Sequence, residues 1–225
     1  MHVSVIIASY NCADYLGRAI RSVINQSLNN KDYEIIVIDD GSTDHTNKIL
    51  EDYNDYIKVI EHKKNKGLAF SCNEGIKKAI GTHIIRVDAD DYINGDLLLC
   101  LSLILNYNKD ISFVWTDHYL IDENENIINT VNIDEINPLK MLAAGVMFRK
   151  SVIEKVGLYD EAMSGVEGED LLMRILSHHE NYQGFHLPLP FYRYMRHDNN
   201  MTNNKDEMKH RYRKLTEKIG KKKKP

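Results

Sequence analysis

The sequence predicts an α/β protein with a mostly parallel sheet, helices on both faces of that sheet and a small antiparallel addition in the second half. Short, nearly continuous apolar runs recur through the first half, as is typical of strands covered on both faces. Between these runs, apolar residues recur every three or four positions, which is the period of an amphipathic helix. Strands and helices that alternate in this order favour parallel pairing with right-handed crossovers.

The first half contains four expected strands with three helices between them. The strands are expected at Val3–Ala8, Ile35–Ile38, Ile57–Ile60 and Ile84–Val87. The apolar stripes of the helices are formed by Leu16, Ala19, Ile20, Val23 and Ile24, then by Ile49, Leu50 and Tyr53, and then by Leu68, Cys72, Ile76 and Ile80. Asn11 can cap the first helix, Ser42 or Thr43 can start the second, and Gly81 can end the third.

The second half is less regular. We expect strands at Ile111–Thr116, Ile127–Val131 and Gly145–Arg149, of which Ile127–Val131 is the candidate for the antiparallel addition. Glu169–His179 has the pattern of an amphipathic helix. From Asn203 onward the chain is polar and is expected to be helical until its closing run of lysines.

Composition and charge narrow the classes of protein. A chain of 225 residues with 43% hydrophobic and 28% charged residues is typical of one medium globular domain. A net charge of -4 argues against a nucleic-acid partner, because such proteins usually carry a basic surplus. Three cysteines without a CxxC pair suit a reducing compartment and argue against a cysteine zinc site. With neither a leader-like start nor an apolar run long enough to span a bilayer, the sequence favours a cytoplasmic location.

Acidic residues cluster where two of the expected strands end. Asp39 and Asp40 follow the second strand, and Asp88, Asp90 and Asp91 follow the fourth. Ligands of open parallel sheets bind outside the carboxyl ends of the strands. A single aspartate there is commonly a turn or cap residue, but three carboxylates within four residues repel one another unless a cation neutralises them. Oxygen ligands of this kind suit Mg²⁺ or Mn²⁺.

These clusters belong to a set of motifs that together resemble a known family. The motifs are Val5–Asn11, Val37–Asp44, Asn65–Gly67, Asp88–Asp91 and Glu169–Asp170. In this order and spacing they are similar to the large inverting family of GT-A-fold glycosyltransferases, the second family in the usual classification, and to its non-processive, bacterial-type members. The resemblance implies a Rossmann-like GT-A domain over residues 1–202, with a nucleotide-binding half (1–91) and an acceptor-binding half (92–202), followed by a helix and lysine-rich tail (203–225).

The resemblance implies roles for residues of the nucleotide-binding half. Ala8 and Tyr10 would pack on the nucleotide base. Asp39 would accept a hydrogen bond from the N–H edge of that base, which suits uracil and hence a UDP-sugar. Lys66 would approach the base or the diphosphate, and Asp88 would contact the ribose or the neighbouring phosphate.

It also implies a metal site and a catalytic pair. Asp90 would bind Mn²⁺ or Mg²⁺ bridging the diphosphate, with Asp91 as a supporting residue. His197, in the segment Tyr192–His197, is equally well interpreted as a further metal ligand or as a surface histidine. Asp170 would act as the general base on the acceptor hydroxyl and Glu169 would help to place the acceptor, although both charges also favour a helix N-terminus.

The sequence departs from the family pattern at several points. Ala8 stands where proline is common, and Ser71–Asn73 lacks the arginine of the usual alanine–arginine–asparagine triplet. The Q-x-x-R-W signature of membrane-embedded, processive synthases is absent, which favours addition of a single sugar.

We therefore expect an inverting hexosyl- or N-acetylhexosaminyltransferase that acts on a glycan or lipid-linked glycan in surface polysaccharide or glycoconjugate synthesis. One alternative is a non-catalytic nucleotide-sugar-binding module, which the presence of Asp90 and Asp170 disfavours. A sugar nucleotidyltransferase would carry a glycine-rich loop with arginine where this chain has Ser9–Ala13. The run Lys221–Lys224 is either a solvated end or a peripheral contact to the anionic inner face of a membrane.

Overall fold

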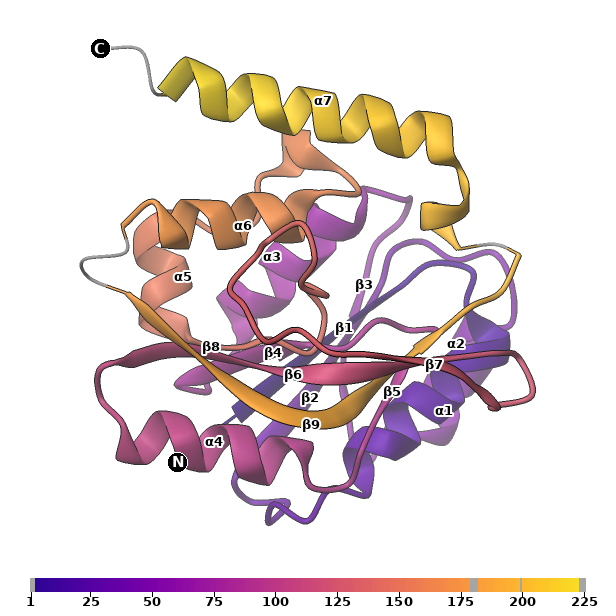
Figure 1. Cartoon of the computed structure of the whole chain (residues 1–225). Coiled ribbons are helices and arrows are strands. Elements are labelled where there is room, and N and C mark those ends of the chain that lie inside the picture. Colours follow the sequence, from indigo (N-terminus) through magenta and orange to yellow (C-terminus); the bar gives the residue numbers. More distant parts are fainter. Residues whose placement is uncertain (1–2, 179–181, 199, 223–225) are drawn as a thin grey trace.

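The computed structural model describes residues 3–178, 182–198 and 200–222 as one mixed sheet with helices on both faces (Figure 1). The strands of the first half are β1 (Val3–Ser9), β2 (Tyr33–Asp39), β3 (Lys58–Glu61) and β4 (His83–Arg86). They pair in parallel in the order β3-β2-β1-β4. The connecting helices are α1 (Ala13–Ile24), α2 (Thr46–Asp52) and α3 (Leu68–Lys78). The prediction of a parallel first half is thus confirmed, with element ends shifted by a few residues.

The second half extends the same sheet. Its strands are β5 (Tyr92–Ile93), β6 (Ile111–Ile121), β7 (Ile127–Val131), β8 (Met147–Arg149) and β9 (Gln183–Met195). β8 runs antiparallel to both β4 and β6, while β9 is parallel to β6 and antiparallel to β5. β7 forms the predicted antiparallel addition, on β6. The helices here are α4 (Leu97–Tyr107), α5 (Lys150–Val156), α6 (Glu167–Leu176) and α7 (Lys205–Lys222), with short 3₁₀ turns at η1 (Glu161–Met163) and η2 (Met201–Asn203).

Alternation along the strands builds one apolar layer on each face. Val5 and Ile7 of β1 pack into the cluster that α1, α2 and α4 cover, while Ile6 between them packs into the cluster that α3, α5 and α6 cover. All three side chains are at most 1% exposed. Because successive side chains of a strand point to opposite faces, a strand buried on both faces needs an unbroken apolar run. Full burial of each such side chain contributes about 2 kcal/mol.

The last helix is docked on the body through a third, smaller apolar cluster. Leu215 of α7 packs with Met163 and Val166, which lie just before α6. Figure 1 shows α7 crossing the molecule on the α6 side of the sheet. Lys223 and Lys224 of the predicted lysine run, and the side chains of Lys221 and Lys222, lie outside the described residues. No described helix combines the length and the apolar character needed to cross a bilayer.

Candidate functional site

A cleft of about 540 Å³ opens beyond the carboxyl ends of β1, β2 and β4. Its lining comes from the loop after β1, the start of α3 and the turn after β4, and also from the loop before β8, the start of α6 and the segment around η2. Of the predicted site residues, the structure brings Ala8, Tyr10, Asp88, Asp90 and Glu169 into the lining. Parallel topology explains this convergence, since all these strand ends lie at one edge of the sheet.

Two loops at this edge hold each other in place. The backbone N–H of Asn11 donates to Ser42 Oγ at 2.9 Å, and the N–H of Thr43 donates to Asn11 Oδ1 at 2.8 Å. Asn11 adopts a φ of 51°, a left-handed conformation that asparagine tolerates better than most residues. The exposed ring of Tyr10, which lies beside this junction, is 46% accessible. The loops thus present an aromatic face at the cleft.

The two aspartates after β2 have different roles. Asp39 is buried, accepts from the N–H of Ser42 at 3.0 Å and is not among the lining residues. Asp40 lines the cleft and accepts from the N–H groups of Lys66 and Gly67 at 2.9 and 2.8 Å. Sequence reasoning missed this shaping role of Asp40. The ammonium of Lys66 lies over the ring of Phe70, so its side chain is also outside the lining.

A buried arginine holds the carboxylates at the centre of the cleft. Arg86, only 7% exposed, pairs with Asp88 at 2.9 Å and with Glu167 at 3.2 Å. Burial raises the pKa of Asp88 to about 6, an effect that Arg86 opposes and that the charges of Asp90 and Glu167 reinforce. Sequence reasoning missed Arg86 and Glu167. The sequence does contain a signal for this role, because Arg86 lies inside the apolar run Ile84–Val87. A charged residue in a buried strand is rarely left unpaired.

The structure brings together Asp90 and His197, which lie far apart in the sequence. Nε2 of His197 lies 2.9 Å from Oδ2 of Asp90, and the imidazole stacks on the ring of Tyr15 at 4.8 Å between centroids. Asn200 approaches the same carboxylate oxygen at 3.4 Å. Within the part of the chain that the structure describes, no three His, Cys, Asp or Glu side chains come together in a way that could hold a metal ion. An aspartate and a histidine still fit Mg²⁺ or Mn²⁺, because such ions take one or two protein ligands and complete their shell with substrate phosphates and water.

Asp91 is not a supporting metal residue, and the structure corrects that expectation. Its side chain is fully buried, accepting from the hydroxyl of Tyr192 at 2.8 Å and from the N–H of Met195 at 2.9 Å. Burial, with the charges of Asp90 and Asp88, holds the pKa of Asp91 well above its usual range. Asp91 therefore ties the turn after β4 to β9.

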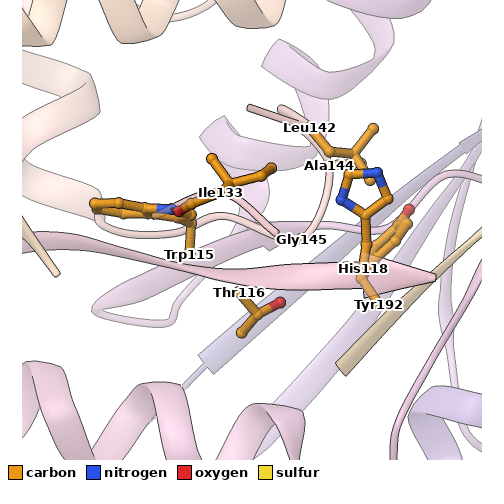
Figure 2. Close-up of a pocket in the computed structure, with 8 residues that line it drawn as sticks. All are labelled: Trp115, Thr116, His118, Ile133, Leu142, Ala144, Gly145 and Tyr192. Carbon is orange, nitrogen blue, oxygen red and sulfur yellow. Dashed lines mark hydrogen bonds between the residues drawn. The ribbon is translucent and has the colours of Figure 1, made fainter. Parts of the chain in front are cut away.

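Figure 2 shows the packing behind that tie, where Tyr192 and Gly145 lie beside Trp115 and His118. The pocket between these side chains measures about 10 Å³, room for no more than a single water. Gly145 has a φ of +81°, and a Cβ there would lie 2.6 Å from Cδ2 of Tyr192. This close contact seats the loop before β8 against the aromatic ring that holds Asp91.

The prediction that Asp170 faces the acceptor is also corrected. Asp170 is 2% exposed, receives a 2.7 Å bond from Nε of Arg174, and pairs with Lys218 of α7. It is absent from the lining of the cleft. The physical reason is its two cationic partners, Arg174 one turn along α6 and Lys218 of α7, which take up the carboxylate.

Glu167 and Glu169 are the α6 carboxylates that line the cleft. Glu167 is 4% exposed and is committed to Arg86 and to the N–H of Gly165, at 2.6 Å. Glu169 is partly exposed and accepts one side-chain hydrogen bond, from the hydroxyl of Tyr212 at 3.1 Å. Burial and then the charge of Glu167 raise the pKa of Glu169. Of the two, Glu169 is free to meet a substrate.

Comparison with known proteins gives the family of the chain. The family model described as glycosyl transferase family 2 matches residues 4–156. The chondroitin synthase of Escherichia coli is 36% identical over 132 residues, 56% of this chain and 18% of the relative. The poly(ribitol-phosphate) beta-glucosyltransferase of Bacillus spizizenii is 40% identical over 103 residues, 44% of this chain and 16% of the relative. The chain therefore spans less than a fifth of these two relatives.

Solved structures share the fold. S. aureus TarS 1–349 in complex with UDP-GlcNAc gives a TM-score of 0.75 at 22% identity, covering 91% of this chain and 61% of TarS. The mannosyltransferase PcManGT from Pyrobaculum calidifontis, in complex with GDP-Man and Mn²⁺, gives 0.68 at 15% identity, covering 85% and 56%. The predicted GT-A fold is confirmed by these matches. With more than half of its residues matched by the family model, the chain belongs to glycosyl transferase family 2.

Proposed function

We propose that the chain transfers a sugar from a nucleoside diphosphate donor to an acceptor hydroxyl with inversion, and that Glu169 is the general base. The observation that supports this most directly is the cleft that Tyr10, Asp90 and Glu169 line together. A donor bound along Tyr10 and Asp90 would turn its sugar toward Glu169. Membership of glycosyl transferase family 2 supports the reaction class.

The proposed donor is a UDP-sugar, and hexosyl and N-acetylhexosaminyl groups are the proposed sugars. The base would lie on Ala8 and Tyr10, with its N–H edge toward Asp39, whose loop contacts the Tyr10 loop through Asn11 and Ser42. The UDP-GlcNAc bound in TarS is a donor of the proposed class. We infer that Asp88, fixed by Arg86, contacts the ribose or the first phosphate. Lys66 would reach the diphosphate only after leaving the ring of Phe70.

Asp90 and His197 are the residues that would hold Mn²⁺ or Mg²⁺, together with the donor diphosphate. When bound, the ion would neutralise the charge that develops on the departing diphosphate. The Mn²⁺ in the PcManGT complex supports this proposal. The protein's own part is to place the imidazole of His197 beside the carboxylate of Asp90, with Asn200 and Tyr15 holding the pair.

Glu169 would take the proton of the acceptor hydroxyl as that oxygen bonds to the anomeric carbon. The bond from the anomeric carbon to the phosphate oxygen breaks at the same time, and the electron pair leaves with the nucleoside diphosphate. A carboxylate whose pKa is raised by burial is a stronger base while it remains ionised at neutral pH. Asp170, committed to Arg174 and Lys218, has a structural role instead.

The proposed acceptor is a glycan or a lipid-linked glycan. Relatives of the chain include chondroitin and hyaluronan synthases, which supports a role in polysaccharide or glycoconjugate synthesis. Because the sequence lacks the Q-x-x-R-W signature, we propose single addition rather than polymerisation. A peripheral membrane contact through Lys221–Lys224 would bring the chain to a lipid-linked acceptor.

Two measurements test the donor and the base. Thermal shift with UDP, GDP, dTDP and CMP, with and without Mn²⁺, should give a metal-dependent rise for UDP, and no rise with any nucleotide would contradict the proposal. Glu169→Gln should lower sugar transfer, or the slow hydrolysis of the donor, by at least 10²-fold while the UDP shift is retained. Retained transfer in this variant would rule out Glu169 as the base.

A further inference from the structure

We propose that Tyr212, in the last helix, is a positioning residue that aims the Glu169 carboxylate into the cleft and stabilises its ionised form. This inference rests on the proposed role of Glu169 as the base. The hydroxyl of Tyr212 donates to Oε1 of Glu169 at 3.1 Å, across 43 residues of sequence. The contact joins α7 to the first turn of α6, which contributes to the lining of the cleft.

α7 is held firmly enough to position a side chain. Leu215, 1% exposed, packs against Met163 and Val166, and the ring of Tyr212 packs on the same cluster. Nζ of Lys214 donates to the carbonyl of Ala162 at 2.6 Å. These contacts attach the helix to the residues directly before α6, so the Tyr212 hydroxyl and Glu169 keep a fixed relation (Figure 1).

Lys218, six residues after Tyr212 on α7, adds a charged anchor. Its ammonium lies 2.7 Å from Oδ2 of Asp160 and also pairs with Asp170. The ion pair between Asp170 and Lys218 therefore helps to hold α7, the helix that carries Tyr212. The residue that sequence reasoning chose as the base would thus support the base through α7.

The charges around Glu169 act in opposite directions, so a neutral hydrogen-bond donor can add to the stability of its ionised form. Glu167 on the same helix disfavours the ionised form of Glu169, and Arg86 of β4 favours it. Arg86 is already shared between Asp88 and Glu167. The backbone N–H of Glu169 itself favours the ionised carboxylate, and among the described side chains Tyr212 adds a donated hydrogen bond to it. Burial and the charge of Glu169 raise the pKa of Tyr212 to about 12, so its hydroxyl stays protonated and able to donate.

A hydrogen bond to a charged group contributes about 1.5–3 kcal/mol, roughly ten- to a hundredfold in an equilibrium. Loss of the hydroxyl should therefore raise the pKa of Glu169 and leave its carboxylate less well oriented. The expected signature is a fall in kcat that is largest at acid pH, with little change in the KM for the donor. A purely structural role would change stability without moving the pH profile.

The test compares Tyr212→Phe with two matched variants. Tyr33→Phe also removes a buried hydroxyl, one that donates to the carbonyl of Ile24 at 3.0 Å away from the cleft. Leu215→Ala weakens the docking of α7 that holds the Tyr212 hydroxyl against Glu169, so it should shift the pH profile in the same direction as Tyr212→Phe. The rate of sugar transfer, or of donor hydrolysis, is measured from pH 5 to 9, and UDP binding and the melting temperature are measured alongside.

We expect Tyr212→Phe to shift the acid limb of kcat/KM to higher pH and to lower kcat about tenfold on that limb. UDP binding should stay as in the wild type, and Tyr33→Phe should leave the limb unshifted. An unshifted limb in Tyr212→Phe, with Glu169→Gln inactive, would overturn the role of Tyr212 alone. Activity in Glu169→Gln would instead overturn the proposed base, whatever Tyr212→Phe shows.

Discussion

Gly145→Ala tests the packing that holds the loop before β8 over the sheet. At its φ of +81°, a Cβ would lie 2.6 Å from Cδ2 of Tyr192, a distance that real Cβ contacts do not reach. The left-handed conformation costs an alanine about 1–2 kcal/mol, and overpacking a filled core adds about 1–3 kcal/mol. We therefore expect the free energy of unfolding to fall by about 2–5 kcal/mol.

Gly157→Ala is the matched control, because its φ is also +81° but its nearest neighbour, Nη1 of Arg174, would lie 3.8 Å away. This variant should lose only the conformational part, about 1–2 kcal/mol. Urea unfolding followed by circular dichroism measures both values. For a chain of this length, each kcal/mol lowers the melting temperature by about 2–4 °C, so the two variants should be clearly separated. Equal losses in the two variants would refute the steric argument at Tyr192.

Three further predictions follow from charges elsewhere in the chain. Burial lowers the pKa of His83 to about 4, so the unfolded chain takes up a proton there first as the pH falls below about 6.5. The free energy of unfolding should then decline between pH 6.5 and 4 by up to about 3 kcal/mol. His83→Gln should remove this part of the decline, which urea titrations at the two pH values would measure. Asp170→Asn should lower the free energy of unfolding by about 2–3 kcal/mol, because Arg174 and Lys218 lose a buried partner while keeping some solvent contact. The folded variant should keep transfer, and loss of transfer at unchanged stability would return the base to Asp170. Deletion of 221–225 should weaken flotation with anionic liposomes by about 1 kcal/mol per lysine near the surface, and unchanged flotation would dismiss the membrane contact.

The first half of the fold could be predicted because its signals are local. An unbroken apolar run such as Ile35–Ile38 reports a strand covered on both faces, and β2 has all of its residues buried. The acidic clusters after β2 and β4 then had to meet at one edge, since parallel strands end on the same side. The convergence of Asp40, Asp88 and Asp90 on one cleft follows from topology alone.

The second half could not be predicted in the same way because its elements are defined by distant partners. β9 carries Pro188 and Pro190 and is only partly buried, so its sequence lacks the pattern of a core strand. It is held by a long pairing with β6 whose register shifts near Asp117. α4 is apolar apart from Ser102 and its last two residues, so it had no polar face by which its period could be recognised.

The orientation of α6 shows how much depends on where a helix begins. Three acidic residues fall in its first turn, and each would be a reasonable base on sequence grounds. Their different roles are set by neighbouring elements. Glu167 pairs with Arg86 of β4, Asp170 pairs with Lys218 of α7, and Glu169 stays partly free. The family model ends at residue 156, before all of α6 and α7. The half of the cleft that we propose binds the nucleotide is therefore predictable from family motifs, whereas the proposed base contacts a helix outside them. Relatives with the same motifs could differ in the pH range of transfer through this last helix alone.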